Sequence, residues 1–344
     1  MDSADVVLRF LRSAQAHGVA EAQLRCVQTH MSWLFFTPGE VLKLKKPVRT
    51  RYLDHSTLAL RERDCREELR LNARLAPGVY LGLMALQRTP AGLCLVPDGA
   101  AQSSGGTTID WLVRMRRLPE GARLDRRIAC HDVDTPEIEA LGALLARFYR
   151  DTPAVAETPL AYLAHFRAER RIDREVLLDT RWALPDAAEV LDRYDSALAE
   201  QAAALGARAA ARRLVEGHGD LRAEHVFLVE PPVVIDALEF DARLRRVDPY
   251  DEVAFLGLEC EMEGAPWIAT SLHRQLVRTL GHEPAPALMR VYIASRALLR
   301  ARLALGHLAD EPPPREAQRW RALATRYLER TQRLWSGDGP HGWP

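Results

Sequence analysis

Lysine is almost absent from this sequence. Its 344 residues contain only Lys43, Lys45 and Lys46, against 44 arginines. Basic and acidic side chains are equal in number, at 47 each, so the formal net charge is zero. That balance argues against proteins that coat nucleic acid or bind membrane surfaces, because both gain affinity from a basic surplus. Three lysines within four residues, in a chain that elsewhere uses arginine, indicate either lysine-specific chemistry or a plain surface cluster, and composition leaves both open.

Cysteine pairs at metal-binding spacing and long apolar segments are missing as well. The five cysteines show no CxxC spacing, so we expect neither a disulfide framework nor a zinc cluster but buried thiols in a reducing cytoplasm. No stretch approaches the roughly 18 apolar residues of a membrane span. Residues 1–15 also lack the continuous apolar segment of a signal peptide. These absences predict a cytoplasmic protein with no membrane partner.

The first half of the chain shows strand signals. With 47% hydrophobic residues and a mass of 38.7 kDa, the chain is large enough for one two-lobed domain or two domains. Two β-rich runs at 32–37 and 40–46, separated by a Pro-Gly pair, predict a hairpin. Alternation along its second strand puts Val41, Lys43 and Lys45 on one face. Further strands are expected over residues 80–87, 92–96 and 111–115, with a loop at 103–106.

Helices are expected between and after these strands. One covers residues 56–75, from a Ser/Thr cap to the turn before Pro77-Gly78. Within it Glu68 and Asn72 lie one turn apart and share a face. From about residue 135 the pattern becomes helical throughout. The predicted segments are 136–150, 160–178, 187–215, 266–280, 285–308 and a last helix that ends near 335, followed by a disordered tail over 336–344.

A β-rich island at 218–241 interrupts the helices. Two apolar runs flank a Glu-Pro-Pro turn and predict a second hairpin. A fold-back centred between Glu230 and Pro231 places His225 opposite Asp236, at roughly 5 Å between the two Cβ atoms. Asp220 lies on the loop that leads into the first strand. Carboxylates on a loop and at a strand end suit phosphoryl transfer, where one group orients the attacking hydroxyl and another holds a metal ion.

These motifs resemble a known family. His218-Gly219-Asp220, followed by strands that end at Asp236, is similar to the catalytic loop and metal-binding aspartate of the aminoglycoside phosphotransferase family. More narrowly, the segments VLKLKKPV, EELRLNARLAP, VRMRRLP, GHGDLRAEH and VVIDALEFD resemble a largely uncharacterised bacterial group. Members of that group are often fused to a P-loop ATPase domain. The sequence contains no GxxxxGK[ST] motif, so we expect that domain to be absent.

The resemblance implies an α+β, two-lobed, protein-kinase-like fold. Its small lobe, over residues 1–114, would hold antiparallel strands and one helix. A hinge at 115–119 would lead to a mainly helical large lobe over 120–335. The implied function is an ATP-dependent kinase that transfers the γ-phosphoryl group to a hydroxyl of a small molecule. No nucleic-acid partner is expected, no partner protein can be inferred, and the acceptor cannot be named from the sequence.

The resemblance also implies site residues. Asp220 would be the catalytic aspartate with His218 beside it, and Asp236 would be the main Mg²⁺ ligand. Either Lys43 or Lys45 would contact the ATP phosphates. The remaining implied residues are Glu68 (or less favoured Glu67) as the partner of that lysine, Met115, Arg116 and Leu118 in the hinge beside adenine, and Asp251 as a structural brace of the catalytic loop.

His225 departs from the family pattern, which has Asn at this position. Imidazole is a poor ligand for a hard ion such as Mg²⁺. The alternatives are that His225 contacts a phosphate, that the site takes Mn²⁺, or that Asp236 holds the metal with Glu239 or Asp241. A glycine-rich phosphate loop is also missing.

Two rival functions follow from these departures. One is an ATP-binding pseudokinase without turnover. The other is a metal-dependent phosphohydrolase, whose metal site would be formed by His218, Asp220, His225 and Asp236. This hypothesis gives the lysines no function. An acidic run, Glu259-Cys260-Glu261-Met262-Glu263, is interpreted either as an attraction for a cationic acceptor or as a solvated helix end.

Overall fold

The computed structural model describes residues 3–310 and 312–335 and divides the chain into two compact units. The first, here the sheet unit, comprises the residues up to Arg123 together with His225–Leu244. The second, here the helical unit, comprises Leu124–Glu224 and the residues from Arg245 onward. The predicted tail at 336–344 lies outside the described residues. In the described ranges no helix is long and apolar enough to cross a membrane.

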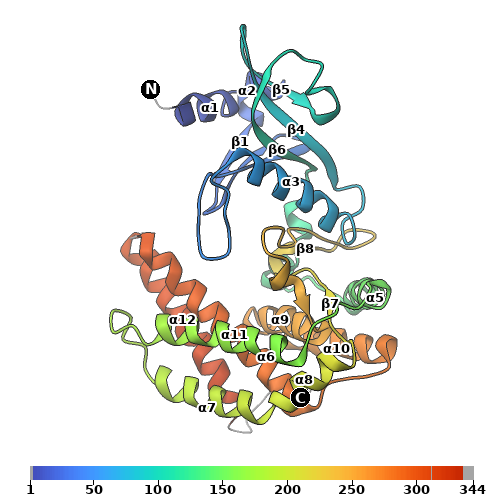
Figure 1. The fold of residues 1–344 in the computed structure, drawn as a ribbon, viewed down its shortest axis with the longest axis vertical. Helices are drawn as coiled ribbons and strands as arrows, with labels where there is room; N and C mark the ends of the chain where they lie inside the picture. The colour runs from blue at the N-terminus through green and yellow to red at the C-terminus, as the bar shows by residue number, and fades with distance from the viewer. Residues whose placement is uncertain (1–2, 311, 336–344) are drawn as a thin grey trace. The chain divides into compact units, whose positions relative to one another are not determined.

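The sheet unit is built on a six-stranded antiparallel sheet (Figure 1). The strand order is β1-β2-β3-β6-β4-β5. The predicted hairpin is confirmed, because β2 and β3 pair with Phe36 opposite Val41. A first strand, β1, was not predicted. The bounds are β1 Arg25–Gln28, β2 Ser32–Phe36, β3 Glu40–Lys45, β4 Tyr80–Thr89, β5 Gly92–Pro97 and β6 Thr107–Arg116.

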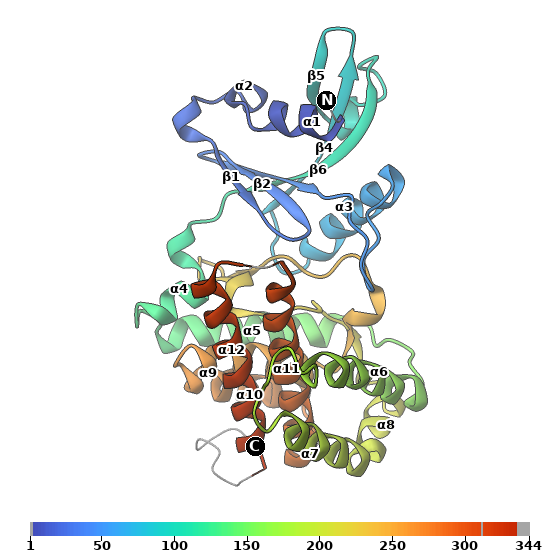
Figure 2. The same ribbon diagram turned by 90° about the vertical axis from the view of Figure 1, so that its left-hand side faces the viewer.

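The two faces of this sheet carry separate apolar clusters. Val41 packs with Cys65 and Val113 on the face that helix α3 (Leu58–Asn72) covers. Leu42 and Leu44 pack with residues of the N-terminal helix α1 (Ser3–Leu11) on the other face. Figures 1 and 2 show the two helices on opposite sides of the sheet. The predicted alternation of β3 is therefore confirmed, and it turns Lys43 and Lys45 toward α3.

Helix α3 begins and ends at local signals. The Thr57 side chain caps its first turn by accepting a hydrogen bond from the Leu60 N–H. Its last residue is Asn72, and Gly78, with a φ of +74°, lies in the turn that follows. The predicted helix over 56–75 is thus present but shorter at both ends. Helix α2 (Ala14–His17) completes the N-terminal part of the unit.

The helical unit contains most of the predicted helices (Figure 2). The long helix predicted over 187–215 is wrong, because the chain forms two helices that break at Gln201, then the short strand β7. An alanine-rich sequence carries no local stop signal, and packing decides the break, since α7 contacts α11 while α8 contacts α6. The helices are α4 Leu124–Ala129, α5 Thr135–Asp151, α6 Pro159–Leu177, α7 Ala187–Glu200, α8 Ala202–Ala210, α9 Pro249–Met262, α10 Pro266–Leu280, α11 Pro286–Gly306 and α12 Pro314–Arg333.

Helix α9 (Pro249–Met262) is absent from the helices predicted by pattern, although the acidic run at its end was interpreted as a possible helix end. All of its residues from Pro249 to Cys260 are buried, including acidic ones. A helix that is buried on every side lacks the one-sided apolar pattern by which amphipathic helices are recognised in a sequence. Strand β7 (Val215–Glu216), just before the predicted catalytic loop, pairs with β10 (Arg246–Val247), just before α9. This pairing brings the loop and the start of α9 together.

The second predicted hairpin is present with a different register. Strands β8 (Val226–Phe227) and β9 (Val233–Val234) pair with Phe227 opposite Val233. The connection therefore has five residues, 228–232, and is centred on Glu230. The predicted turn was centred between Glu230 and Pro231. As a result the His225 carbonyl accepts a hydrogen bond from the Ile235 N–H at 2.9 Å. The prediction that His225 lies opposite Asp236 is wrong by one residue.

Candidate active site

Lys43 stands at the centre of a charged cluster in the sheet unit. Strand β3 directs it toward α3, where its Nζ lies 2.9 Å from Glu68 Oε1. The same Nζ lies 2.6 Å from Asp236 Oδ1, which comes from the segment after β9. One ammonium group thus joins a helix carboxylate to a carboxylate that lies 193 residues after the lysine in the chain.

Lys45 occupies the same face two residues later, but more deeply. Its Nζ lies 2.6 Å from Glu68 Oε2 and also contacts Glu239. Its side chain is 0% exposed, whereas that of Lys43 is 13% exposed. Burial alone would lower the pKa of Lys45, but the carboxylates of Glu239 and Glu68 raise it above its ordinary value. Glu68 therefore binds one lysine with each oxygen.

Asp236 is held in an unusual backbone conformation. Its φ is +65°, in the left-handed region that non-glycine residues seldom adopt and that often marks a functional site. Burial would raise the pKa of its carboxyl, but the charges of Lys43 and His225 hold that pKa well below its usual range. The His225 Nε2 lies 3.7 Å from Asp236 Oδ2. The Asp236 side chain remains 44% exposed, so the carboxylate is ionised and open to a ligand.

The predicted catalytic loop lies in the helical unit and is held by Glu252 of α9. Glu252 Oε2 accepts hydrogen bonds from the His218 N–H at 2.9 Å and from the Tyr149 hydroxyl at 2.7 Å. Its Oε1 accepts from the Gly219 N–H at 2.5 Å. The His218 Nδ1 in turn accepts from the Asp220 N–H at 3.3 Å. The loop is thus fixed by one buried carboxylate and by its own histidine.

Glu252 was missed by the sequence reasoning, which named its neighbour Asp251 as the brace. Asp251 instead binds Arg296 of α11 with both oxygens, at 2.9 and 2.7 Å. The side chains of Asp251 and Glu252 are both buried. Which of these adjacent acids faces the catalytic loop depends on the rotation of α9 about its axis. A sequence pattern does not define that rotation in a helix that is buried all round.

Gly217 leaves no room for a side chain. A Cβ atom there would lie 2.5 Å from Glu252 Oε2 and 2.5 Å from Val247 Cγ2. We predict that Gly217→Ala destabilises the helical unit by about 1–3 kcal/mol, because the Glu252 contacts must shift. Gly306→Ala is the matched control, since a Cβ there meets no atom within 4 Å. Denaturant unfolding tests both, and equal stability of the two variants would contradict the packing assigned to Glu252.

The acidic run at the end of α9 is divided, because Glu259 is buried whereas Glu263, which follows the last residue of the helix, is exposed as expected of a solvated helix end. Glu259 is buried and lies 3.1 Å from Arg300 Nε and 3.4 Å from Arg222 Nε. The Tyr327 hydroxyl donates to it at 2.5 Å. Arg222 also lies 3.8 Å from Asp220 Oδ2. The charge next to Asp220 is therefore largely balanced by arginine.

The predicted hinge residues differ in burial. Met115 is buried at the end of β6, in the cluster under α3. The Arg116 N–H donates to the Val79 carbonyl at 2.7 Å, and its side chain is exposed. Leu118 packs on an apolar cluster that includes Val79 and Phe227. Apolar side chains of the first strands and of the 225–244 segment thus surround this part of the chain.

Sequence comparison finds relatives of this chain but no family model. No family model matches the chain. An uncharacterized protein of Mycobacterium tuberculosis and one of Mycobacterium bovis are each 28% identical to it over 336 residues, which is 92% of this chain. The chain spans 62% of the length of these relatives.

Solved structures give a more specific result. The GDP complex of wild-type aminoglycoside 2′-phosphotransferase-IIIa superimposes with a TM-score of 0.53 and 12% identity, over 95% of this chain and 98% of the enzyme. The GDP complex of a mutant of that enzyme gives a TM-score of 0.54 and 11% identity, over 97% and 99% of the two chains. The chain has the aminoglycoside phosphotransferase fold. The predicted α+β, kinase-like fold class is thereby confirmed.

The phosphotransferase fold here carries few metal ligands. Among residues 3–310 and 312–335, no three His, Cys, Asp or Glu side chains are grouped to hold a metal ion. Glu239 is engaged by Lys45, and Asp241 binds Arg243 at 2.8 Å. Asp236, with His225 beside it, is left as the exposed carboxylate of the cluster. Mg²⁺ fits such a site, because it is commonly held by one or two carboxylates together with substrate phosphates.

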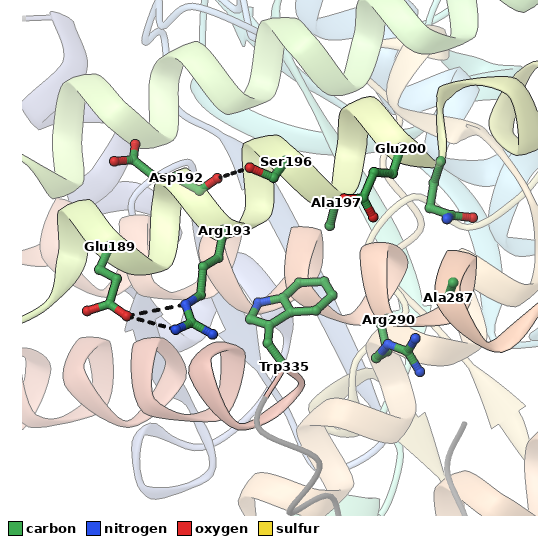
Figure 3. Close-up of a pocket in the computed structure, with 10 residues that line it drawn as sticks. Glu189, Asp192, Arg193, Ser196, Ala197, Glu200, Ala287, Arg290 and Trp335 are labelled. Atoms are coloured by element: carbon green, nitrogen blue, oxygen red, sulfur yellow. Dashed lines mark hydrogen bonds and ion pairs between the residues drawn. The ribbon is translucent and has the colours of Figure 1, made fainter.

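The helical unit also contains an open pocket of about 630 Å³ between α7, α11 and Trp335 (Figure 3). Seven of the ten residues that line it are polar or charged, including Arg193 and Glu189, which form an ion pair. None of the predicted site residues lines it.

Proposed function

We propose that this chain is an ATP-dependent kinase that transfers the γ-phosphoryl group to a hydroxyl of a small molecule. One observation carries the proposal: Lys43 holds both the helix carboxylate Glu68 and the carboxylate of Asp236, in a chain with a phosphotransferase fold. A lysine held by a helix glutamate, beside an ionised aspartate, is the arrangement that positions and neutralises nucleotide phosphates in kinases.

Lys43 rather than Lys45 is the proposed phosphate partner. Lys43 is partly exposed and shares Asp236, a group that is itself open to a ligand. Lys45 is closed off by Glu68 and Glu239 and has no exposed surface. Its proposed role is to hold Glu68 in place. Met115, Arg116 and Leu118 are the proposed neighbours of adenine, since apolar side chains surround Met115 and Leu118 and Arg116 lies between them in the chain.

Asp236 is the proposed holder of Mg²⁺, with His225 next to it. When bound, the ion would neutralise charge on the ATP phosphates. The low pKa of Asp236 supports this role, because the carboxylate stays ionised at neutral pH without the metal. Glu239 is proposed as a partner of Lys45 and not as a metal ligand.

Asp220 is the proposed catalytic residue of the helical unit. The acceptor hydroxyl forms a bond to the γ-phosphorus, the bond from that phosphorus to the bridging oxygen of ADP breaks, and the hydroxyl proton passes to the Asp220 carboxylate. Orientation of the hydroxyl matters more than base strength in such a transition state. Glu252 and His218 are proposed to position the loop, because they hold its backbone N–H groups.

The five cysteines support the proposed cytoplasmic location. All five are free, and free thiols are typical of proteins in reducing compartments. Cys65 and Cys260 are buried, whereas Cys26 and Cys130 are exposed, so the expectation that all are buried is wrong.

A metabolite screen for ATP consumption tests the proposal. Wild-type protein is incubated with ATP and pools of hydroxyl-bearing metabolites, with Mg²⁺ and with Mn²⁺. We expect ADP to form with at least one pool and to require the metal. If ATP raises the melting temperature and no pool yields ADP, the pseudokinase alternative replaces the proposal. If phosphate esters are hydrolysed with a tightly bound transition metal and no ATP binding, the phosphohydrolase alternative does.

His225 gives the metal preference a specific test. Imidazole suits Mn²⁺ better than Mg²⁺, so we expect wild-type turnover to be higher with Mn²⁺. His225→Asn should shift the Mg²⁺ to Mn²⁺ turnover ratio toward Mg²⁺ by about tenfold, and chelation should abolish turnover in both proteins. An unchanged ratio in the variant would show that His225 has no influence on the metal.

A further inference from the structure

Asn72 joins helix α3 to the segment that carries Asp236. Its side chain is 1% exposed. Its Nδ2 donates to the Glu68 carbonyl oxygen at 2.8 Å, one turn earlier in the helix. Its Oδ1 accepts a hydrogen bond from the Ala237 N–H at 3.0 Å. The two ends of one buried amide therefore bind the lysine-holding residue and the residue that follows Asp236.

This contact lies where the backbone leaves regular structure. The β8–β9 pairing ends before Asp236, whose left-handed φ of +65° persists only if the surroundings enforce it. The N–H groups of Asp236 and Ala237 bind side chains instead of a neighbouring strand. The Asp236 N–H donates to the Tyr80 hydroxyl oxygen at 3.1 Å, and the Ala237 N–H donates to Asn72. Each buried donor is thereby satisfied.

A third contact fixes the far end of the same segment. Glu239 binds Lys45, which also binds Glu68 at 2.6 Å. Residues 236–239 are thus attached to α3 directly through Asn72 and indirectly through Lys45. A displacement of either the helix or the segment would break buried polar contacts, which are costly to leave unmade.

We propose that Asn72 is a positioning residue that couples Glu68 to Asp236. Resting on the proposed function, the inference is that the lysine-holding and metal-holding carboxylates keep one arrangement whether or not nucleotide is bound. Helix α3 and residues 236–239 then move as one body, and the conformation that Asp236 needs for metal and nucleotide is assembled in advance.

Asn72→Leu tests this coupling, because leucine has a similar size and no hydrogen-bonding groups. Hydrogen exchange of the peptide that contains Ala237, measured without nucleotide, should become at least about fivefold faster. The gain in ATP affinity that Mg²⁺ gives the wild type should fall by a similar factor, while ATP affinity without Mg²⁺ should stay unchanged.

Gln87→Leu is the matched control. Gln87 is also a fully buried amide of the sheet unit, and its Nε2 donates to the Ala101 carbonyl at 2.7 Å, away from Asp236. The Gln87→Leu variant should lose a comparable amount of stability, while exchange at Ala237 and the gain in ATP affinity from Mg²⁺ stay at their wild-type values. Normal exchange at Ala237 in Asn72→Leu, or the same loss of the Mg²⁺ effect in Gln87→Leu, would overturn the coupling.

Two further readouts keep the result decisive. If Asn72→Leu does not fold, Tyr80→Phe removes only the hydroxyl that accepts from Asp236, and it should accelerate exchange at Asp236 and weaken the Mg²⁺ effect. Normal behaviour of that variant would overturn the coupling. Hydrogen exchange needs no nucleotide, so a wild type that fails to bind ATP would contradict the proposed function while the exchange data still decide the coupling.

Discussion

Replacement of Asp220 by alanine is expected to lower turnover by about 100- to 10,000-fold, the usual contribution of a positioned general base. ATP affinity should stay at the wild-type value, because Lys43, Glu68 and Asp236 lie in the sheet unit and are untouched. Steady-state kinetics with the best acceptor pool measures turnover, and calorimetric titration measures ATP binding.

A surface carboxylate provides the control for this variant. Asp151 is exposed in the same unit and pairs with its neighbour Arg150. Asp151→Ala should therefore keep both turnover and ATP affinity. If Asp220→Ala retains turnover, Asp220 takes no part in the chemical step. If the variant loses ATP affinity together with turnover, Asp220 acts through the stability of the fold.

Lys43→Met and Lys45→Met are expected to fail in different ways. Loss of the Lys43 ammonium should lower kcat/KM by about 100- to 1,000-fold, by analogy with other single groups that stabilise transition-state charge. Its cost in stability should be smaller than that of Lys45→Met, since Asp236 is 44% exposed and water can replace the ammonium there, while buried Glu68 loses one lysine but keeps Lys45.

Lys45→Met should instead cost about 3–5 kcal/mol of unfolding free energy. It leaves Glu239 and one oxygen of Glu68 buried without an ammonium partner. Chemical denaturation and ATP titration of the two variants separate these effects. Wild-type stability of Lys45→Met together with its complete loss of ATP binding would assign the phosphate contact to Lys45.

The sequence predicted the local elements around the site well. A Pro-Gly turn and strand alternation are local properties, so the β2–β3 hairpin and the shared face of Lys43 and Lys45 could be derived before the structure. The choice between the lysines could not, because it depends on Asp236 and Glu239, which reach β3 only in the folded chain.

Other errors have the same physical origin. The β8–β9 register depends on whether the turn holds an even or odd number of residues. The observed turn has an odd number, so the register differs by one residue and His225 does not lie opposite Asp236. The break at Gln201 is set by neighbouring helices. Asn72 was singled out for sharing a face with Glu68, yet its contact with Ala237 needed the fold.

Transfer of label from ATP tests the central proposal most directly. Wild-type protein and Asp220→Ala are incubated with γ-phosphoryl-labelled ATP, metal and the hydroxyl-metabolite pools, and the label is followed into organic products and inorganic phosphate. We expect the wild type to place label in a phosphorylated hydroxyl compound and Asp220→Ala to leave it in ATP. Label that stays in ATP with every pool, or that appears only as inorganic phosphate in both proteins, would contradict a kinase with Asp220 at its centre.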